Sequence, residues 1–152
     1  MEKQNFYDLN YDQLKNFLIE KANVEKNKAN MRAQQMFNAV YKKNIKNFDE
    51  LTTFSLDLRE KIKKLISLAK PKIIDIQKSK DGTIKFLLEL KDKRNVETVL
   101  IPDKSQSRYT ICLSVSVGCY LSCEFCATAQ ISKNLVRNLS PGEIISQIIL
   151  CK

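Results

Sequence analysis

The stretch Gly118–Cys126 reads GCYLSCEFC, and its three cysteines are spaced C-x3-C-x2-C. Three thiolates on one short loop can bind three irons of a cubane iron–sulfur cluster, which leaves the fourth iron without a protein ligand. An open metal position is typical of a catalytic site, because a small molecule can bind there. The spacing therefore predicts a catalytic cluster held by Cys119, Cys123 and Cys126, since a closed electron-transfer cluster needs a fourth cysteine nearby.

Two other interpretations of these cysteines stay open. A zinc knuckle needs a fourth ligand, which has to be Cys112 or Cys151 because the chain contains no histidine. Neither residue has the paired spacing that is usual in zinc sites. The three cysteines are alternatively ordinary small buried residues, although three within eight positions is an unusual density for that role.

The elements that flank the cysteine loop are a strand and a helix. Alternation predicts a strand over Thr110–Ser116, with Cys112, Ser114 and Ser116 on the face opposite its apolar residues. After the loop, Ser140 is a predicted N-cap, Pro141 takes the first helical position and Glu143 completes a capping box. The helix is expected to run to Lys152. Its predicted buried face consists of Ile144, Ile145, Ile148 and Ile149.

Upstream of the loop the pattern indicates an antiparallel sheet. Strands are predicted over residues 72–78, 83–90 and 96–101, and Asp81-Gly82 is a hairpin turn signal between the first two. Glu97 shares its side of the third strand with Val99 and Ile101. Burial on that side would raise the pKa of Glu97 toward a value useful for a general base, and the alternative is an edge-strand charge that faces water.

The first seventy residues are predicted to be helical. Asn10 and Gln13 form a capping-box pattern ahead of the first helix, and a second helix carries Ala33, Met36 and Tyr41. A third helix begins near Ser55, keeps apolar residues at helical spacing to Ala69 and is stopped by Pro71.

Composition narrows the class of protein. The net charge of +9 over 152 residues favours a polyanionic partner such as nucleic acid. The absence of histidine excludes Ser-His and Cys-His catalysis within the chain. No apolar run is long enough for a transmembrane helix, and the start of the chain lacks a signal peptide, so we expect a cytoplasmic protein with no membrane partner. Five cysteines in such a protein favour metal binding or catalysis over disulfides.

A C-x3-C-x2-C loop with an aromatic residue, Phe125, before its third cysteine resembles the radical S-adenosylmethionine superfamily. The surrounding segments resemble one group within it, the RlmN-type adenine C2-methyltransferases, which act on large-subunit ribosomal RNA and on tRNA. The resemblance rests on the segments SKDGTIK (79–85), VETV (96–99) with Ile101-Pro102, TIC (110–112), FCATAQ (125–130) and RNL (137–139). The related ribosomal C8-methyltransferases share these segments.

This resemblance implies a 4Fe–4S cluster on Cys119, Cys123 and Cys126, with S-adenosylmethionine chelating the open iron and an electron donor protein supplying the electron for radical formation. Phe125 matches an aromatic position near the adenine of the cofactor. Cys112 matches the family's resolving cysteine, which releases a methylene-linked RNA adduct by forming a disulfide with a distal methylated cysteine. Glu97 matches the family's proton acceptor.

The expected fold class is α/β, and three regions are predicted. Residues 1–70 form a helical RNA-binding domain, 71–104 a β-strand linker region, and 105–152 the first β/α unit of a partial radical-SAM barrel. The chain departs from the family because it ends after that unit, so the distal cysteine is missing. Ser116 also stands where glutamine is common, and residues 130–137 form a longer stretch than usual. We therefore expect an N-terminal fragment that is inactive alone. The alternatives are a fragment of a ribosomal RNA adenine C8-methyltransferase and a non-catalytic RNA-binding fragment.

Overall fold

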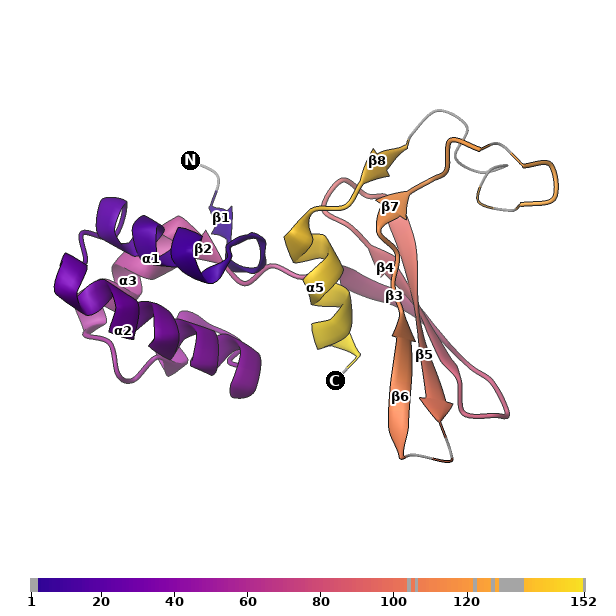
Figure 1. The fold of residues 1–152 in the computed structure, drawn as a ribbon, viewed down its shortest axis with the longest axis horizontal. Coiled ribbons are helices and arrows are strands. Elements are labelled where there is room, and N and C mark those ends of the chain that lie inside the picture. Colours follow the sequence, from indigo (N-terminus) through magenta and orange to yellow (C-terminus); the bar gives the residue numbers. More distant parts are fainter. Residues whose placement is uncertain are drawn as a thin grey trace. The chain divides into compact units, whose positions relative to one another are not determined.

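The computed structural model describes residues 3–103, 105, 107–121, 123–126, 128 and 136–151. Ala127, Ala129 and Gln130 of the FCATAQ segment, most of the stretch 130–137 and the predicted helix end at Lys152 lie outside the described residues. The chain forms two compact units, Met1–Ala69 and Lys70–Lys152, each with its own elements (Figure 1).

The first unit is a small helical domain. Its main helices are α1 (Tyr11–Glu20), α2 (Lys26–Phe37) and α3 (Leu56–Leu65). A short helical turn precedes α1 at Phe6–Asp8, and two more lie between α2 and α3 at Asn38–Lys42 and Phe48–Glu50. Apolar side chains at helical spacing fill its interior, among them Phe6, Leu14, Leu18, Met36 and Ile62.

Local sequence signals fix where these helices begin. The predicted capping box ahead of α1 is confirmed: the Asn10 side chain accepts from the Gln13 amide, and the Gln13 side chain accepts from the Asn10 amide. The predicted end of the third helix is wrong, because α3 stops at Leu65. Strand β2 (Ile66–Ser67) follows at once and pairs in parallel with β1 (Gln4–Asn5), so a partner distant in sequence overrides the local helical pattern.

The second unit contains a four-stranded antiparallel sheet. Its strands are β3 (Lys72–Lys78), β4 (Ile84–Glu89), β5 (Asn95–Asp103) and β6 (Arg108–Cys112), and their order in the sheet follows the sequence. The hairpin turn predicted at Asp81-Gly82 is confirmed. Gly82 has a φ of +94°, a conformation that side-chain-bearing residues rarely adopt, and Ser79 and Thr83 close the turn by a backbone hydrogen bond.

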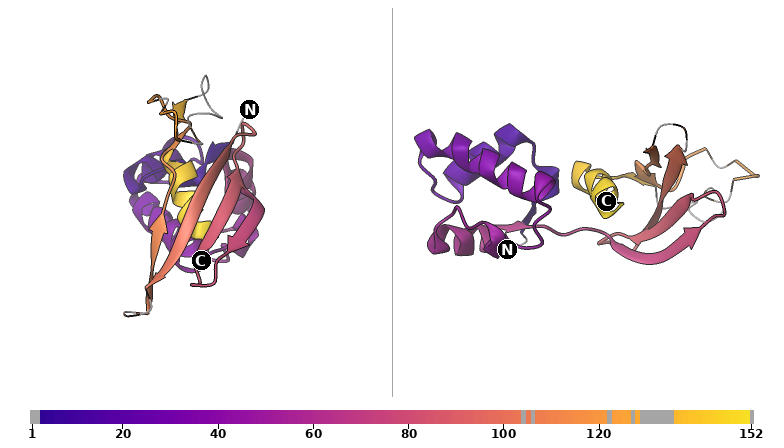
Figure 2. Two further views of the ribbon diagram at one scale, coloured as in Figure 1. Left: turned by 90° about the vertical axis from the view of Figure 1, so that its right-hand side faces the viewer. Right: turned by 90° about the horizontal axis from the view of Figure 1, so that it is seen from below.

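Helix α5 (Pro141–Leu150) lies against one face of this sheet (Figures 1 and 2). We call this face of the sheet the α5 face. The sheet and the helix close a core of Phe86, Leu88, Leu90, Val96, Val117 and Leu139, with Ile144, Leu150 and Cys151 packed against it. The capping box between Ser140 and Glu143 is confirmed.

The predicted buried face of α5 is only partly correct. Ile149 is buried and Ile144 packs on the core, but Ile148 is 37% exposed. The buried residues of the helix are Gly142, Ser146, Gln147 and Ile149. The buried side of α5 therefore includes small and polar residues, not isoleucines alone.

A single strand over Thr110–Ser116 was expected, and the structure corrects this. Strand β6 ends at Cys112, and a separate short strand β7 (Ser116–Val117) pairs with β8 (Arg137–Asn138). Between them, the Gln147 side chain accepts from the Ser114 amide at 3.0 Å and donates to the Ser114 carbonyl at 2.9 Å. A side chain from α5 thus replaces the neighbouring strand at this point.

Candidate functional site

The cysteine loop leaves and returns through a narrow neck in the second unit. Strand β7 pairs with β8 so that Val117 is opposite Arg137, and the Leu139 amide donates to the Val115 carbonyl at 2.9 Å. Val117 and Leu139 are both buried in the core. Gly118 begins the loop with a φ of +70°, which suits glycine at this turn. Both ends of the loop are therefore anchored in the sheet–helix core.

The three predicted cluster ligands follow this neck. Cys119, Cys123 and Cys126 are half-buried thiols that form no disulfides. The Leu121 amide donates to the Cys119 sulfur at 3.5 Å, and the Cys126 amide donates to the Cys123 carbonyl at 3.0 Å, which closes a turn. Amide donors directed at cysteine sulfur are one of the ways in which a protein tunes an iron–sulfur cluster.

The donor set of the loop fits an iron–sulfur cluster in its chemistry. Three thiols, no imidazole and an amide directed at one sulfur suit iron–sulfur ligation. Among the described residues, no group of three or more Cys, Asp or Glu side chains is close enough to hold a metal ion. Binding a cluster therefore requires the three thiols to draw together.

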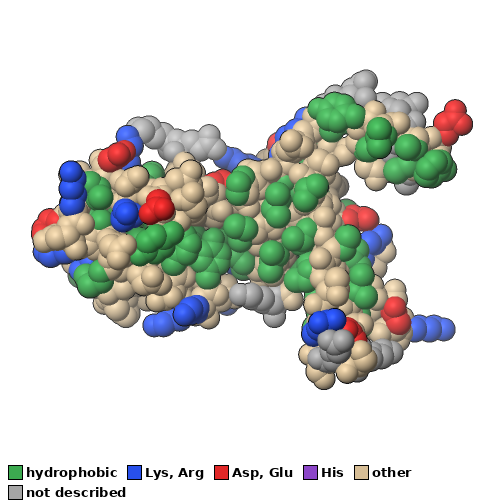
Figure 3. Space-filling view, viewed as in Figure 1, with side chains coloured by type: hydrophobic (Ala, Val, Ile, Leu, Met, Phe, Trp, Pro, Cys, Tyr) green, Lys and Arg blue, Asp and Glu red, His purple; other side chains and the backbone are tan. Residues whose placement is uncertain are grey.

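Large apolar side chains of the loop are exposed. Tyr120 is 81% exposed, Leu121 79% and Phe125 92%. In the space-filling view, hydrophobic side chains are visible along the loop that projects after β7 (Figure 3). An exposed aromatic beside a metal-ligand loop is available to stack on a planar ligand. Phe125, the predicted adenine contact, is accessible for this role.

The structure places Glu97 and Cys112 on the same face of the sheet, opposite the α5 face. Cys112 is the cross-strand partner of Val99, and Val99 is two residues from Glu97 on β5. Side chains two residues apart on a strand share a face, as do direct cross-strand partners. We call this surface the Glu97 face; the left view of Figure 2 looks onto it, with α5 behind the sheet.

Glu97 is exposed, which corrects the interpretation of a buried carboxylate and agrees with the alternative of a charge facing water. Its side chain is 53% exposed, and its carboxylate pairs with the Lys85 ammonium at 3.0 Å. The neighbours Val96 and Thr98 are the buried ones. Both alternating sets of residues on β5 contain apolar side chains, so alternation alone did not identify the core side. The described structure supplies no burial that would activate Glu97 as a base.

Cys112 and Cys151 differ in their surroundings. Cys112 is exposed at the end of β6 on the Glu97 face. Cys151 follows α5 and packs against the core on the α5 face, where burial raises the pKa of its thiol. The two thiols are therefore separated by the sheet.

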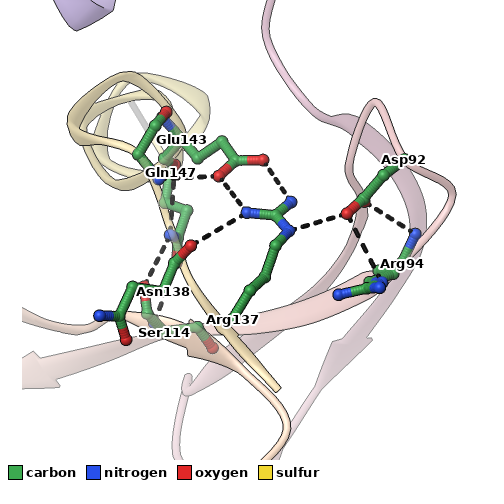
Figure 4. Close-up of polar contacts among 8 residues, drawn as sticks. Asp92, Arg94, Ser114, Arg137, Asn138, Glu143 and Gln147 are labelled. Carbon is green, nitrogen blue, oxygen red and sulfur yellow. Dashed lines mark hydrogen bonds and ion pairs between the residues drawn. The ribbon is translucent and has the colours of Figure 1, made fainter. Parts of the chain in front are cut away.

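Arg137 is at the centre of a polar network that the sequence did not reveal as a unit (Figure 4). Its guanidinium donates two hydrogen bonds of 2.8 Å to the two carboxylate oxygens of Glu143, and its Nε donates to Asp92 at 2.8 Å. These hydrogen bonds hold the pKa of the Glu143 and Asp92 carboxyls below their ordinary values, and they raise the pKa of Arg137. Glu143 was foreseen only as a helix cap, and Arg137 only as part of the RNL segment.

Gln147 is a second polar residue that periodicity missed. It is fully buried, and besides its two bonds to Ser114 it accepts from the Thr98 hydroxyl at 2.8 Å. The side-chain NH₂ group of Gln147 also donates to the backbone carbonyl of Glu143 at 3.2 Å. The sequence signal was a glutamine among isoleucines. It becomes interpretable only when the facing backbone of Ser114 is known.

The first unit carries lysines on an open surface hollow of about 410 Å³. Lys3, Lys46 and Lys63 line it together with Asp49, and Lys63 pairs with Asp49 and with Glu60. Other lysines of this unit also have acidic partners, such as Lys28 with Glu25 at 2.8 Å. The surface is basic but already contains ion pairs. In the part of the chain that the structure describes, no helix is long and apolar enough to cross a membrane.

Comparisons with known proteins agree with these features. Residues 4–68 match the family described as "Ribosomal RNA large subunit methyltransferase N-terminal domain". A protein of Campylobacter fetus named "Dual-specificity RNA methyltransferase RlmN" is 41% identical, over 98% of this chain and 42% of its own length. A Staphylococcus aureus protein named "Probable dual-specificity RNA methyltransferase RlmN" is 38% identical, over 97% of this chain and 38% of its own length.

A solved structure of a related protein is also similar to this chain. The crystal structure of a radical SAM methyltransferase from Sphaerobacter thermophilus superimposes with a TM-score of 0.80 and 31% identity, covering 97% of this chain and 41% of that chain. The chain thus spans about two fifths of the length of the relatives it matches.

Proposed function

The chain belongs to the RlmN family of radical SAM methyltransferases, and we propose that it supplies the RNA-binding and cluster-binding parts of an enzyme that methylates adenine in RNA. The proposed reaction transfers a methyl group from S-adenosylmethionine to C2 of adenine in large-subunit ribosomal RNA and in tRNA. The observation that carries the proposal is the three-thiol loop held at both ends by β7 and β8.

Cys119, Cys123 and Cys126 would hold a 4Fe–4S cluster, which when bound supplies the electron that cleaves S-adenosylmethionine. Phe125, exposed beside the third ligand, would stack on the adenine of that cofactor. The Leu121 amide would stabilise the Cys119 thiolate through its hydrogen bond to sulfur.

Glu97 and Cys112 would act on the RNA substrate from one surface. Their shared face supports this pairing of roles, because the register of β5 and β6 puts both side chains on one surface of neighbouring strands. Cys112 would resolve the RNA adduct: its thiolate would form an S–S bond with the distal cysteine as the bond from that sulfur to the methylene carbon breaks and its electron pair passes to the adenine. The exposure of Cys112 at the strand end leaves it accessible. Glu97 would accept a proton from the substrate carbon, for which it has to leave or share its ion pair with Lys85.

The helical unit would contribute most of the affinity for RNA. Lysines distributed over its surface and around the hollow favour contacts to phosphates rather than to bases. We propose an electron donor protein as a further partner, as the source of the electron that the cluster would supply.

A chimera tests the proposed reaction. This chain joined to the remaining part of the Campylobacter fetus relative is reconstituted anaerobically and assayed with methyl-labelled S-adenosylmethionine, reductant and ribosomal RNA. Mass spectrometry of the nucleosides then separates 2-methyladenosine from 8-methyladenosine. We expect 2-methyladenosine from the chimera and none from its Cys119→Ala variant. Product equal in both would contradict the proposal, and 8-methyladenosine would reassign the position of methylation.

A further inference from the structure

The neck of the cysteine loop is anchored by apolar packing at both ends, and its returning side has an additional charged network. Val117 on β7 and Leu139, directly after β8, are both buried in the core. On the β8 side, Arg137 is the cross-strand partner of Val117 and keeps 31% of its side chain exposed. A two-residue strand pair has little stability of its own, so the returning strand needs further contacts.

Besides the burial of Leu139, Arg137 supplies such contacts by joining three separate segments. Its guanidinium binds Glu143 on the first turn of α5 through two parallel hydrogen bonds, and it binds Asp92 in the turn between β4 and β5. It also donates to the carbonyl of Asn138 at 3.1 Å. Figure 4 shows the guanidinium lying between the two carboxylates. The bidentate geometry suits arginine and is unavailable to lysine.

The helix cap does not need Arg137. The Glu143 carboxylate also accepts from the Ser140 amide at 2.8 Å, and the Ser140 hydroxyl accepts from the Glu143 amide at 3.2 Å. Those two bonds complete the capping box without any arginine. The bonds from Arg137 are additional, and they act on the segment that returns from the cysteine loop.

We propose that Arg137 is a positioning residue which fixes the return of the cysteine loop, so that Cys119, Cys123 and Cys126 can close on one cluster. This inference rests on the proposed cluster-binding function. Because the three thiols have to draw together to bind iron, a fixed neck lowers the conformational entropy lost on binding. Arg137 touches neither cluster nor substrate, so its effect is on retention of iron and on accessibility of the loop.

The test compares Arg137→Met, which removes every bond, with Arg137→Lys, which keeps the charge but cannot bridge both carboxylates in the same way. Arg108→Met is the matched control. Arg108 also forms an ion pair, with Asp103 at 3.2 Å, but this pair is not part of the cysteine loop or its neck. Each protein is reconstituted anaerobically with iron and sulfide, and the rate of iron release to a chelator is measured. Loss of a residue that supports metal ligands typically weakens binding by about 10–100-fold, and we expect release from Arg137→Met to be faster by a factor in this range.

A second measurement needs no cluster. The alkylation rates of individual cysteines in the iron-free proteins are followed by peptide mass spectrometry. We expect Cys119, Cys123 and Cys126 to react faster in Arg137→Met while Cys151, in the core, stays slow and shows that the fold persists. The alkylation rates of these three cysteines in Arg137→Lys should lie between those of the parent chain and Arg137→Met. The rates in Arg108→Met should match those of the parent chain.

The outcomes separate the inference from the function on which it rests. If the parent chain binds no iron, the proposed function fails, and the alkylation rates alone then decide whether Arg137 fixes the loop. If the parent chain binds iron and Arg137→Met releases it at the same rate with unchanged alkylation, the inference is overturned. Fast alkylation of Cys151 as well would assign Arg137 to general stability and also overturn it.

Discussion

Cys112 and Cys151 lie on opposite faces of one sheet. Cys112 lies on the Glu97 face, because it is the cross-strand partner of Val99. Cys151 packs against the core residues on the α5 face. A disulfide requires Cα atoms within about 7 Å and side chains directed at each other, which two faces of a sheet do not allow. Cys151 therefore cannot act as the partner of Cys112 in this fold.

The two thiols should differ in reactivity. Cys112 is exposed, whereas burial raises the pKa of Cys151 and reduces its thiolate fraction at pH 8. We expect Cys112 to be alkylated by iodoacetamide about tenfold faster or more than Cys151, and mild oxidation should not join them. Peptide mass spectrometry of the timed reaction measures both. A Cys112–Cys151 disulfide in the folded chain would contradict the arrangement of the two faces.

The Arg137 network should make the second unit sensitive to acid. The pKa values of Glu143 and Asp92 are lowered in the folded state, so their contribution to stability is present above the ordinary carboxyl pKa values of 4.5 and 3.8. It is lost as the pH falls through their folded values. We expect Glu143→Gln to lower the free energy of unfolding by about 1–2 kcal/mol at pH 7.

The difference between the parent chain and Glu143→Gln should shrink as the pH is lowered from 6 to 3. Urea unfolding at each pH, followed by circular dichroism, measures it. The comparison variant is Glu25→Gln at the exposed N-cap of α2, where the hydrogen bond from Lys28 also lowers the carboxyl pKa; because water screens this exposed pair, its difference should be smaller at every pH. A difference that stayed constant down to pH 3 would show that ionisation of Glu143 is not the cause.

Gln147 should be among the most sensitive positions of the second unit. Replacing it by Leu leaves the amide and carbonyl of Ser114 and the hydroxyl of Thr98 without their side-chain partner in a buried site. We expect a loss of about 2–3 kcal/mol in the free energy of unfolding, since unsatisfied buried polar groups are costly. Ile148→Ala, at a partly exposed position of the same helix, should cost less. Equal losses would argue that Gln147 contributes only volume.

Some parts of this fold could be predicted from local sequence because their causes are local. The Asn10–Gln13 and Ser140–Glu143 caps and the Gly82 turn each depend on residues within four positions of one another. The role of the three cysteines as cluster ligands, which their spacing predicts, stays a prediction.

Other parts could not be predicted, because their causes come from distant segments. The break after Cys112 depends on Gln147, which lies 33 residues from Ser114 in sequence. The network of Arg137 depends on Asp92, which is 45 residues away. The side on which Glu97 lies was ambiguous because both faces of β5 contain apolar residues, and the choice is made by the pairing of β4 with β5.

RNA binding by the chain should be mainly electrostatic. The net charge of +9 and the dispersed lysines of the first unit predict contacts to phosphates, each releasing counterions. We expect the affinity for unrelated RNA fragments to fall about tenfold or more between 50 and 200 mM salt, with little dependence on sequence. Fluorescence anisotropy with two RNAs of different sequence tests this. Affinity that is independent of salt would contradict it.

The most direct test of the account is the iron content of the chain after anaerobic reconstitution with iron and sulfide. We predict about four irons per chain and a broad charge-transfer absorbance. We also predict near-complete loss of iron in Cys119→Ala, Cys123→Ala and Cys126→Ala, and full content in Cys112→Ala and Cys151→Ala. Full iron content after loss of Cys123, or stoichiometric zinc in place of iron, would contradict these predictions.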